Sequence, residues 1–161
     1  MKKVFSLALI AACAAALAAT AAGSAGRSGP SSTRRAAAVV ISTRKIGKLG
    51  TVLVNAKGRT LYMFVPDKRK RVTCKGSCAA VWPPVKLPKG ARPVAKGKAK
   101  ASLLGSDPNP SGGRVVTYAK WPLYTYVADS APGKASGQGL NLNGGLWYVL
   151  SPSGKVIRTK P

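Results

Sequence analysis

The chain has 161 residues and carries 27 Lys and Arg against three Asp and no Glu, which gives a formal net charge of +24. Its length allows one domain, or two small repeated units that share a core. The absence of His excludes Ser-His triads, His-based acid–base pairs and His metal sites, and three Asp leave little for paired-carboxylate chemistry.

The N-terminus has the pattern of a bacterial signal peptide, which we predict at residues 1–22. Two Lys follow the first Met, and residues 4–22 are uncharged and mostly Ala, Leu, Ile and Val. Two processing routes remain open. Residues 10–13 resemble a lipobox, which would place a lipid anchor on Cys13, whereas cleavage near Ala22 would release a secreted protein.

Two stretches of low complexity divide the rest of the chain. Residues 23–38 are small, polar and basic, and predict a flexible, disordered tether. Residues 95–113 contain alternating Lys and then a run rich in Pro, Ser and Gly, and predict a linker. We therefore expect a first repeat unit at residues 39–94 and a second at residues 114–161.

Both units have the pattern of β structure. In the first, residues 51–54 predict a strand, residues 55–58 a turn and residues 59–65 a second strand, with alternate residues on opposite faces. In the second, residues 147–158 predict a hairpin around a Pro-Ser-Gly turn. Eighteen Gly and 12 Pro in the chain also favour turns over long helices.

Only residues 77–81 look helical. Ser77 is the expected N-cap, and the Pro83-Pro84 pair would end the helix. The predicted fold class is therefore mainly β: a small domain built from two related hairpin-containing repeats, with one short helical turn and a disordered N-terminal tether.

A run of four cations, Lys68, Arg69, Lys70 and Arg71, directly follows Asp67. Such a run on a loop can bind phosphate, nucleic acid or anionic lipid headgroups. It can equally be a solvated, highly charged loop with no particular partner. The overall charge makes attraction to polyanions the firmer expectation, without implying specificity.

Cys74 and Cys78 form a C-x3-C pair, and the only other thiol is that of Cys13. In an oxidising envelope we expect them to form a structural disulfide that fixes the loop around them. Two alternatives are a redox-active dithiol and a soft-metal site with Met63 as a thioether ligand. Redox pairs more often show C-x-x-C, and such metal sites usually add a His.

The two units are internally similar. Residues 61–67 match residues 123–129 at a constant offset of 62, with Leu, Tyr, an aromatic residue and Asp at the same positions. Trp82 corresponds to Trp147 after an insertion of three residues. Self-similarity of this kind suggests duplicated units that bury their apolar faces against each other.

The repeated polar residues are Tyr62 and Asp67 in the first unit and Tyr124 and Asp129 in the second. One interpretation is a paired site for a ligand or an ion. The other is structural: each Asp bonds backbone N–H groups of the turn after the strand, and each Tyr packs with its hydroxyl paired. The second interpretation is favoured because duplicated residues at equivalent positions usually hold a fold.

Several motifs carry a family resemblance: both copies of Tyr-x(4)-Asp, and the segments at residues 58–62, 74–84, 122–124 and 137–147. Together they make the chain resemble the secreted-repeat family of bacterial envelope lipoproteins. The resemblance implies a location in the envelope, often through a lipid anchor. It implies no activity, although a link to envelope electron transport has been suggested for some members.

We therefore expect an exported, non-enzymatic protein that is either lipid-anchored in the cell envelope or secreted. Its expected partners are anionic envelope polymers or lipid headgroups, bound non-specifically, with no cofactor and no specific nucleic acid. The alternative is an accessory in electron transfer or metal handling that uses Cys74 and Cys78.

Overall fold

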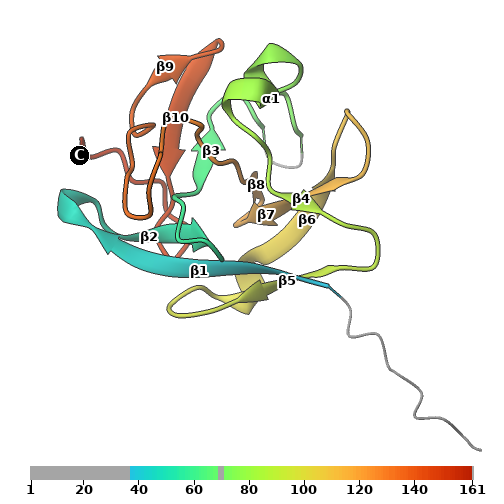
Figure 1. Cartoon of the computed structure of the whole chain (residues 1–161), viewed down its shortest axis with the longest axis horizontal. Coiled ribbons are helices and arrows are strands. Elements are labelled where there is room, and N and C mark those ends of the chain that lie inside the picture. Colours follow the sequence, from blue (N-terminus) through green and yellow to red (C-terminus); the bar gives the residue numbers. More distant parts are fainter. Residues whose placement is uncertain (1–36, 69–70, 161) are drawn as a thin grey trace, which may run out of the picture. The chain divides into compact units, whose positions relative to one another are not determined.

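The computed structural model describes residues 37–68 and 71–160, which belong to one unit of mainly β structure (Figure 1). The predicted signal peptide at residues 1–22, the lipidation candidate Cys13 and the tether up to residue 36 lie outside the described residues. Arg69 and Lys70 of the basic run lie outside them as well.

Ten short strands, one helix and two 3₁₀ turns make up the described part of the chain. In order they are β1 (Ala38–Ile46), a 3₁₀ turn (Gly47–Leu49), β2 (Gly50–Asn55), β3 (Tyr62–Phe64), α1 (Ser77–Val81), β4 (Lys86–Leu87), β5 (Arg92–Ala95), a 3₁₀ turn (Ala101–Leu103), β6 (Leu104–Pro108), β7 (Arg114–Tyr118), β8 (Trp121–Pro122), β9 (Asn141–Leu142) and β10 (Gly145–Val149). The strands form three small sheets, in the orders β2-β1-β5, β3-β10-β9 and β4-β7-β6, and β8 also pairs with β7.

Each repeat begins with an antiparallel hairpin. In the first, β1 pairs with β2 from Ile41 opposite Asn55 to Ile46 opposite Gly50. In the second, β6 pairs with β7 from Leu104 to Pro108. The inner strands β2 and β7 contain consecutive buried residues, because both faces of these strands are covered by the core.

The repeats then exchange their later strands. β10 of the second repeat pairs with β3 of the first, so the two lie side by side although they are far apart in sequence (Figure 1). In the first repeat, residues 83–85 correspond to the end of β10, and they pair with the second repeat. Val85 N donates to Leu123 O (2.8 Å), and Thr125 N donates to Pro83 O (2.9 Å). Pro83 and Pro84 lack an N–H, which explains why this second pairing does not become a regular strand.

The centre of the exchange is a reciprocal backbone contact. Tyr62 N donates to Tyr124 O (2.9 Å), and Tyr124 N donates to Tyr62 O (3.0 Å). The two Tyr are equivalent residues of the two repeats, so the repeats meet about a local pseudo-twofold axis. Side chains above and below this contact form two core clusters.

The alternation predicted for the second strand of the first repeat is present in the core. Tyr62 and Phe64 lie in one buried cluster, and Leu61 and Met63 lie in the other. Val65 is the exception, because it is 38% exposed beyond the end of β3. The regular part of this strand, Tyr62–Phe64, is shorter than the predicted 59–65.

The predicted helix is present as α1, with Trp82 at its C-terminal end, but the expected cap at Ser77 is wrong. Ser77 is the first helical residue, and Gly76 occupies the cap position with φ of 54° and no side-chain cap bond. That positive φ strongly favours Gly over Ser.

Two segments of the chain are more regular than the sequence suggested. The stretch at residues 95–113, predicted as a low-order linker, contains β6, so that prediction is wrong for Leu104–Pro108. Its five register pairs with β7 supply order that the Leu-Gly-Ser-Asp-Pro sequence does not signal. β1 was not predicted, and it starts at Ala38, within the predicted tether. At the C-terminus, the predicted hairpin is present in a short form, because Leu150 and Val156 make an antiparallel bridge and Ser151 N donates to Lys155 O (2.9 Å) across the turn.

Candidate functional site

The repeated Tyr and Asp form two hydrogen-bonded pairs that cross between the repeats. Tyr62 Oη donates to Asp129 Oδ2 (2.7 Å), and Tyr124 Oη donates to Asp67 Oδ2. All four side chains are buried. We call these four residues the cross-repeat clasp, because each Tyr is satisfied by the Asp of the other repeat.

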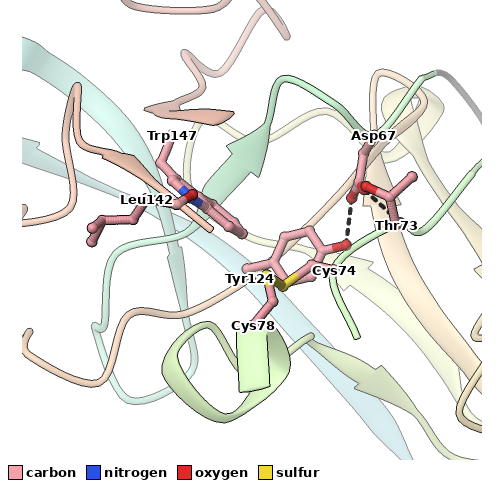
Figure 2. The surroundings of a disulfide bond; sticks show 7 residues. All are labelled: Asp67, Thr73, Cys74, Cys78, Tyr124, Leu142 and Trp147. Atoms are coloured by element: carbon pink, nitrogen blue, oxygen red, sulfur yellow. Dashed lines mark hydrogen bonds between the residues drawn. A yellow bond between two sulfur atoms is a disulfide. The ribbon is translucent and has the colours of Figure 1, made fainter. Parts of the chain in front are cut away.

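The second oxygen of each Asp holds the loop that follows it. Asp67 Oδ1 accepts bonds from Thr73 N (2.6 Å) and Thr73 Oγ1 (2.5 Å), as Figure 2 shows beside Tyr124. Asp129 Oδ1 accepts a bond from Ser136 N (2.8 Å). Since the carboxylate oxygens are occupied by these internal donors, the geometry supports the structural interpretation over a ligand site.

Burial shifts the pKa of both tyrosines of the clasp and of Asp67. It raises the pKa of Tyr62 and of Tyr124 far above the usual value for a phenol, and the bonded carboxylate of each pair raises it further. Both hydroxyls therefore remain donors at neutral pH. Burial also raises the pKa of Asp67, against the opposing effect of the bonds from Thr73 and Tyr124.

An aromatic column runs through the same core cluster. Phe64, Trp147, Trp82 and Tyr126 stack in that order, with successive ring centroids 4.1, 3.9 and 4.1 Å apart. Tyr62 meets Trp82 edge-on at 5.4 Å, and Tyr124 meets Trp147 in the same way at 5.3 Å. The column therefore repeats the symmetry of the clasp, and its two central rings are the pair of Trp matched in the sequence.

The indole N–H groups of the two central rings differ. Trp147 Nε1 donates to Leu142 O (3.0 Å), and both residues are labelled in Figure 2. Trp82 Nε1 is buried and has no hydrogen-bond partner within the described part of the chain. Burial of the indole N–H therefore costs more free energy at Trp82 than at the equivalent Trp147.

A disulfide holds the loop between Asp67 and Trp82. Cys74 and Cys78 are bonded, with their Cα atoms 5.3 Å apart, and the predicted disulfide is thereby confirmed (Figure 2). Both Cys are buried in the core cluster that contains Tyr124. The disulfide joins Cys74, which follows the Thr73 that Asp67 binds, to the first turn of α1.

A glutamine holds the equivalent loop of the second repeat. Gln138 Nε2 donates to Ile157 O (2.8 Å) and Thr159 O (2.9 Å), and Gln138 Oε1 accepts a bond from Val149 N (2.9 Å). Its side chain thus ties the loop both to β10 and to the C-terminal segment. Gln138 lies in the segment at residues 137–147 that carries the family resemblance, and a single Gln gives no sequence signal of this role.

The adjacent Gly137 is required by close packing. A Cβ at this position would lie 2.7 Å from Trp82 Cη2 and 3.0 Å from Tyr62 Cε1. Gly137 N also donates to Tyr62 Oη (3.2 Å). The motif therefore lets the second loop close directly over the clasp and the aromatic column.

The basic run is only partly described. Lys68 and Arg71 are exposed, and Arg71 N donates to Lys68 O (2.8 Å). The structure thus places both ends of the predicted anion-binding run at the surface. Of the groups predicted as sites, the structure joins the Tyr and Asp residues to one another and the two Cys to each other.

A family model described as a secreted repeat of unknown function matches the chain twice, at residues 43–86 and at residues 108–151. Each match contains one Tyr and one Asp of the clasp and one Trp of the column. Searches of curated proteins and of solved structures found no match to this chain. Within residues 37–68 and 71–160, no helix is long and apolar enough to cross a membrane.

Proposed function

Because the chain belongs to the family of secreted repeats of unknown function, we propose that it is an exported, non-enzymatic protein of the cell envelope that associates with anionic surface material. The association uses the excess of Lys and Arg and needs no cofactor. Family membership supports export. The binding and the absence of catalysis are the parts that experiment has to test.

The observation that carries the proposal is the imbalance of charge. The chain has 27 basic residues and three acidic ones, so few of its cations can have an acidic partner in the same chain. Asp67 and Asp129 are buried, at 0% and 2% exposed, and bond the clasp and its loops. They therefore contribute little screening to the cations at the surface.

Such a surface binds anionic material through many weak contacts. Near an anionic membrane surface each Lys or Arg contributes about 1 kcal/mol, and the attraction falls off within a Debye length. Association of this kind is strong at low ionic strength, tolerant of the chemical identity of the polyanion, and lost in high salt.

Vesicle sedimentation tests the proposal directly. The purified protein is mixed with phosphatidylglycerol vesicles and, as a control, with phosphatidylcholine vesicles over a series of NaCl concentrations. We expect sedimentation with the anionic vesicles at low salt and its loss at about 1 M NaCl, where the Debye length is about 3 Å. Equal sedimentation with both lipids, or none with either, would overturn the proposal.

The basic run needs its own comparison. Changing Lys68, Arg69, Lys70 and Arg71 to Gln is matched by a variant in which four exposed Lys elsewhere are changed: Lys45, Lys86, Lys120 and Lys155. If the run is a preferred contact, its variant dissociates from anionic vesicles at lower salt than the matched variant. Identical salt profiles would reject a special role for the run.

The proposal includes processing at the N-terminus. Lipid on Cys13 would attach the protein to a membrane, whereas cleavage near Ala22 would release it. The mass of the mature N-terminal peptide distinguishes the two, because acylation adds the mass of the lipid chains to a peptide that begins with Cys13.

The alternative, electron transfer or metal handling through the Cys pair, has less support. It requires free thiols during the working cycle, whereas Cys74 and Cys78 are bonded and only 2% and 8% exposed. Thiol titration of the exported protein without reductant tests it. Free, reactive thiols would favour the alternative, and their absence before denaturation and reduction would favour the structural disulfide.

A further inference from the structure

A cationic groove of about 500 Å³ lies over the first hairpin, and no residue of the clasp lines it. Three segments contribute to it: β1 through Ser42, Thr43 and Arg44, the turn after β2 through Lys57, and the end of β5 through Lys96. We call this the β1 groove. Its volume is in the range of sites that bind small molecules.

The backbone brings these three segments together. β5 runs parallel to β1 with Ala95 opposite Ile41, and Lys96 N donates to Ile41 O (2.8 Å). Lys96 is therefore fixed beside Ser42, although more than fifty residues separate them in the sequence. The position of Lys96 follows from strand pairing and does not depend on a flexible loop.

The turn that carries Lys57 is fixed as well. Asn55 Oδ1 accepts bonds from Lys57 N (2.9 Å) and Arg59 N (3.0 Å), and Gly58 N donates to Asn55 O (2.9 Å). Gly58 has φ of 73°, which this turn requires and which favours Gly. A Cβ there would lie 3.3 Å from Arg44 Nη2, so Arg44 lies closely against the turn.

The charges around the groove are all positive. Arg44, Lys57 and Lys96 line it and are exposed, and none of the three Asp of the chain is among its lining residues. Three cations around one concave surface attract an anion more strongly than the same cations spread over a flat one. The groove therefore differs from the rest of the basic surface in its concave shape and in the fixed backbone of its lining residues.

Hydroxyl groups and apolar side chains complete the lining. Ser42 and Thr43 lie among the cations, and Thr43 Oγ1 accepts a bond from Lys98 N (3.0 Å), which leaves its hydroxyl proton free to donate. Val40 and Val54 add apolar surface. A ligand with an anionic group and a small organic part matches this mixture.

We propose that the β1 groove binds a phosphate ester, with Arg44, Lys57 and Lys96 around the phosphoryl oxygens and the organic part of the ester against Val40. This inference rests on the proposed association with anionic material and narrows it to one chemical class and one site. A phosphate ester has several acceptor oxygens and up to two charges, which suits an Arg fork flanked by two Lys.

The first experiment uses free glycerol phosphate as the probe and glycerol as its control. Backbone amide shifts are followed by NMR during titration at about 0.15 M salt, where long-range surface attraction is screened. We expect glycerol phosphate, and not glycerol, to shift the amides of residues 42–44, 57–58 and 96. Shifts spread over the whole basic surface, or no shifts, would overturn the proposed site.

A pair of charge-matched variants separates the groove from net charge. The groove variant combines Arg44→Gln, Lys57→Gln and Lys96→Gln, and the control variant combines Lys48→Gln, Lys86→Gln and Lys155→Gln. All six side chains are exposed, so both variants are expected to fold. We expect about a tenfold loss of glycerol phosphate affinity in the groove variant and little change in the control. Equal losses would overturn the proposal.

Two further arms distinguish the source of the phosphate ester, and both use the same variants. Selective loss of binding to phosphatidylglycerol vesicles by the groove variant would support a lipid headgroup. Selective loss of binding to poly(glycerol phosphate) would support a phosphodiester polymer. If both variants bind both materials equally, the groove proposal fails while the general association stands. If the unchanged protein binds neither, the general association fails.

Discussion

The two repeats share a core geometry but hold their loops by different chemistry. In both, an Asp caps the loop, a Tyr crosses to the other repeat and a Trp enters the aromatic column. In the first repeat a covalent bond between Cys74 and Cys78 closes the loop, and in the second three hydrogen bonds of Gln138 do so. The two repeats therefore keep the same core residues, whereas the bonds that close their loops differ.

The largest expected effect tests whether the two Trp are energetically equivalent. Trp82 and Trp147 are both fully buried and stack on each other. We expect Trp82→Ala and Trp147→Ala each to lower the free energy of unfolding by about 3–5 kcal/mol, measured by urea denaturation. An effect below about 1 kcal/mol at either position would show that the column is not central to the core.

The next effect concerns the hydrogen-bonded loop. Gln138→Ala leaves two carbonyl groups and one buried N–H without their side-chain partner, so we expect a loss of about 3 kcal/mol in denaturant unfolding. Hydrogen exchange should increase first at Val149 and around Ile157. As a control, Ser153→Ala changes an exposed side chain of the neighbouring turn and should alter stability little.

The covalent loop is expected to contribute somewhat less. Replacing both Cys74 and Cys78 by Ser removes a short cross-link, for which chain entropy gives about 2 kcal/mol. Reductant should destabilise the unchanged protein by a similar amount and leave the Ser variant unaffected. If reductant alters both proteins equally, its effect does not act through this disulfide.

A smaller effect separates the two indole groups. Trp147→Phe removes the hydrogen bond to Leu142 O, whereas Trp82→Phe removes an N–H that has no partner within the described residues. We therefore expect Trp147→Phe to be the more destabilising change by about 1 kcal/mol in urea unfolding. The opposite order would show that the N–H of Trp82 makes an interaction of its own.

The smallest effect is the pH dependence of the stability that one Asp of the clasp contributes. Burial raises the pKa of Asp67 above its ordinary value of 3.8, so the folded state binds this proton more tightly than the unfolded chain. The stability from this group is fully present below pH 3.8 and is lost as the pH rises through the folded-state pKa. Asp67→Asn should therefore be less destabilising at about pH 7 than at about pH 4, and denaturant unfolding at both pH values tests this.

Local signals in the sequence were sufficient for the outline of the repeats. The constant offset between residues 61–67 and 123–129 predicted the duplication, which the two family matches confirm. The alternation of residues around Tyr62 predicted which side chains lie on each face of that strand. The prolines after Trp82 predicted the end of α1. In each case the cause lies within a few residues of its effect.

The contacts between the repeats could not be predicted in the same way. A single Tyr-x(4)-Asp motif does not reveal that Tyr62 bonds Asp129 rather than its own Asp67, because the choice depends on the exchange of strands. The role of Gln138 depends on a C-terminal segment about twenty residues away. Arg44 and Lys96 likewise become neighbours in the β1 groove only through the parallel pairing of β1 and β5.

The exchange of strands makes the covalent connection between the halves dispensable for their cohesion. Protease scission in the exposed turn at residues 97–98, which lies between β5 and β6, would leave two fragments still joined through the β3–β10 pairing and both Tyr–Asp pairs of the clasp. By the same reasoning, a polypeptide with a single repeat could complete its interior only by pairing with a second copy of itself. The fused chain is thus equivalent to a dimer whose stoichiometry is fixed by covalent linkage.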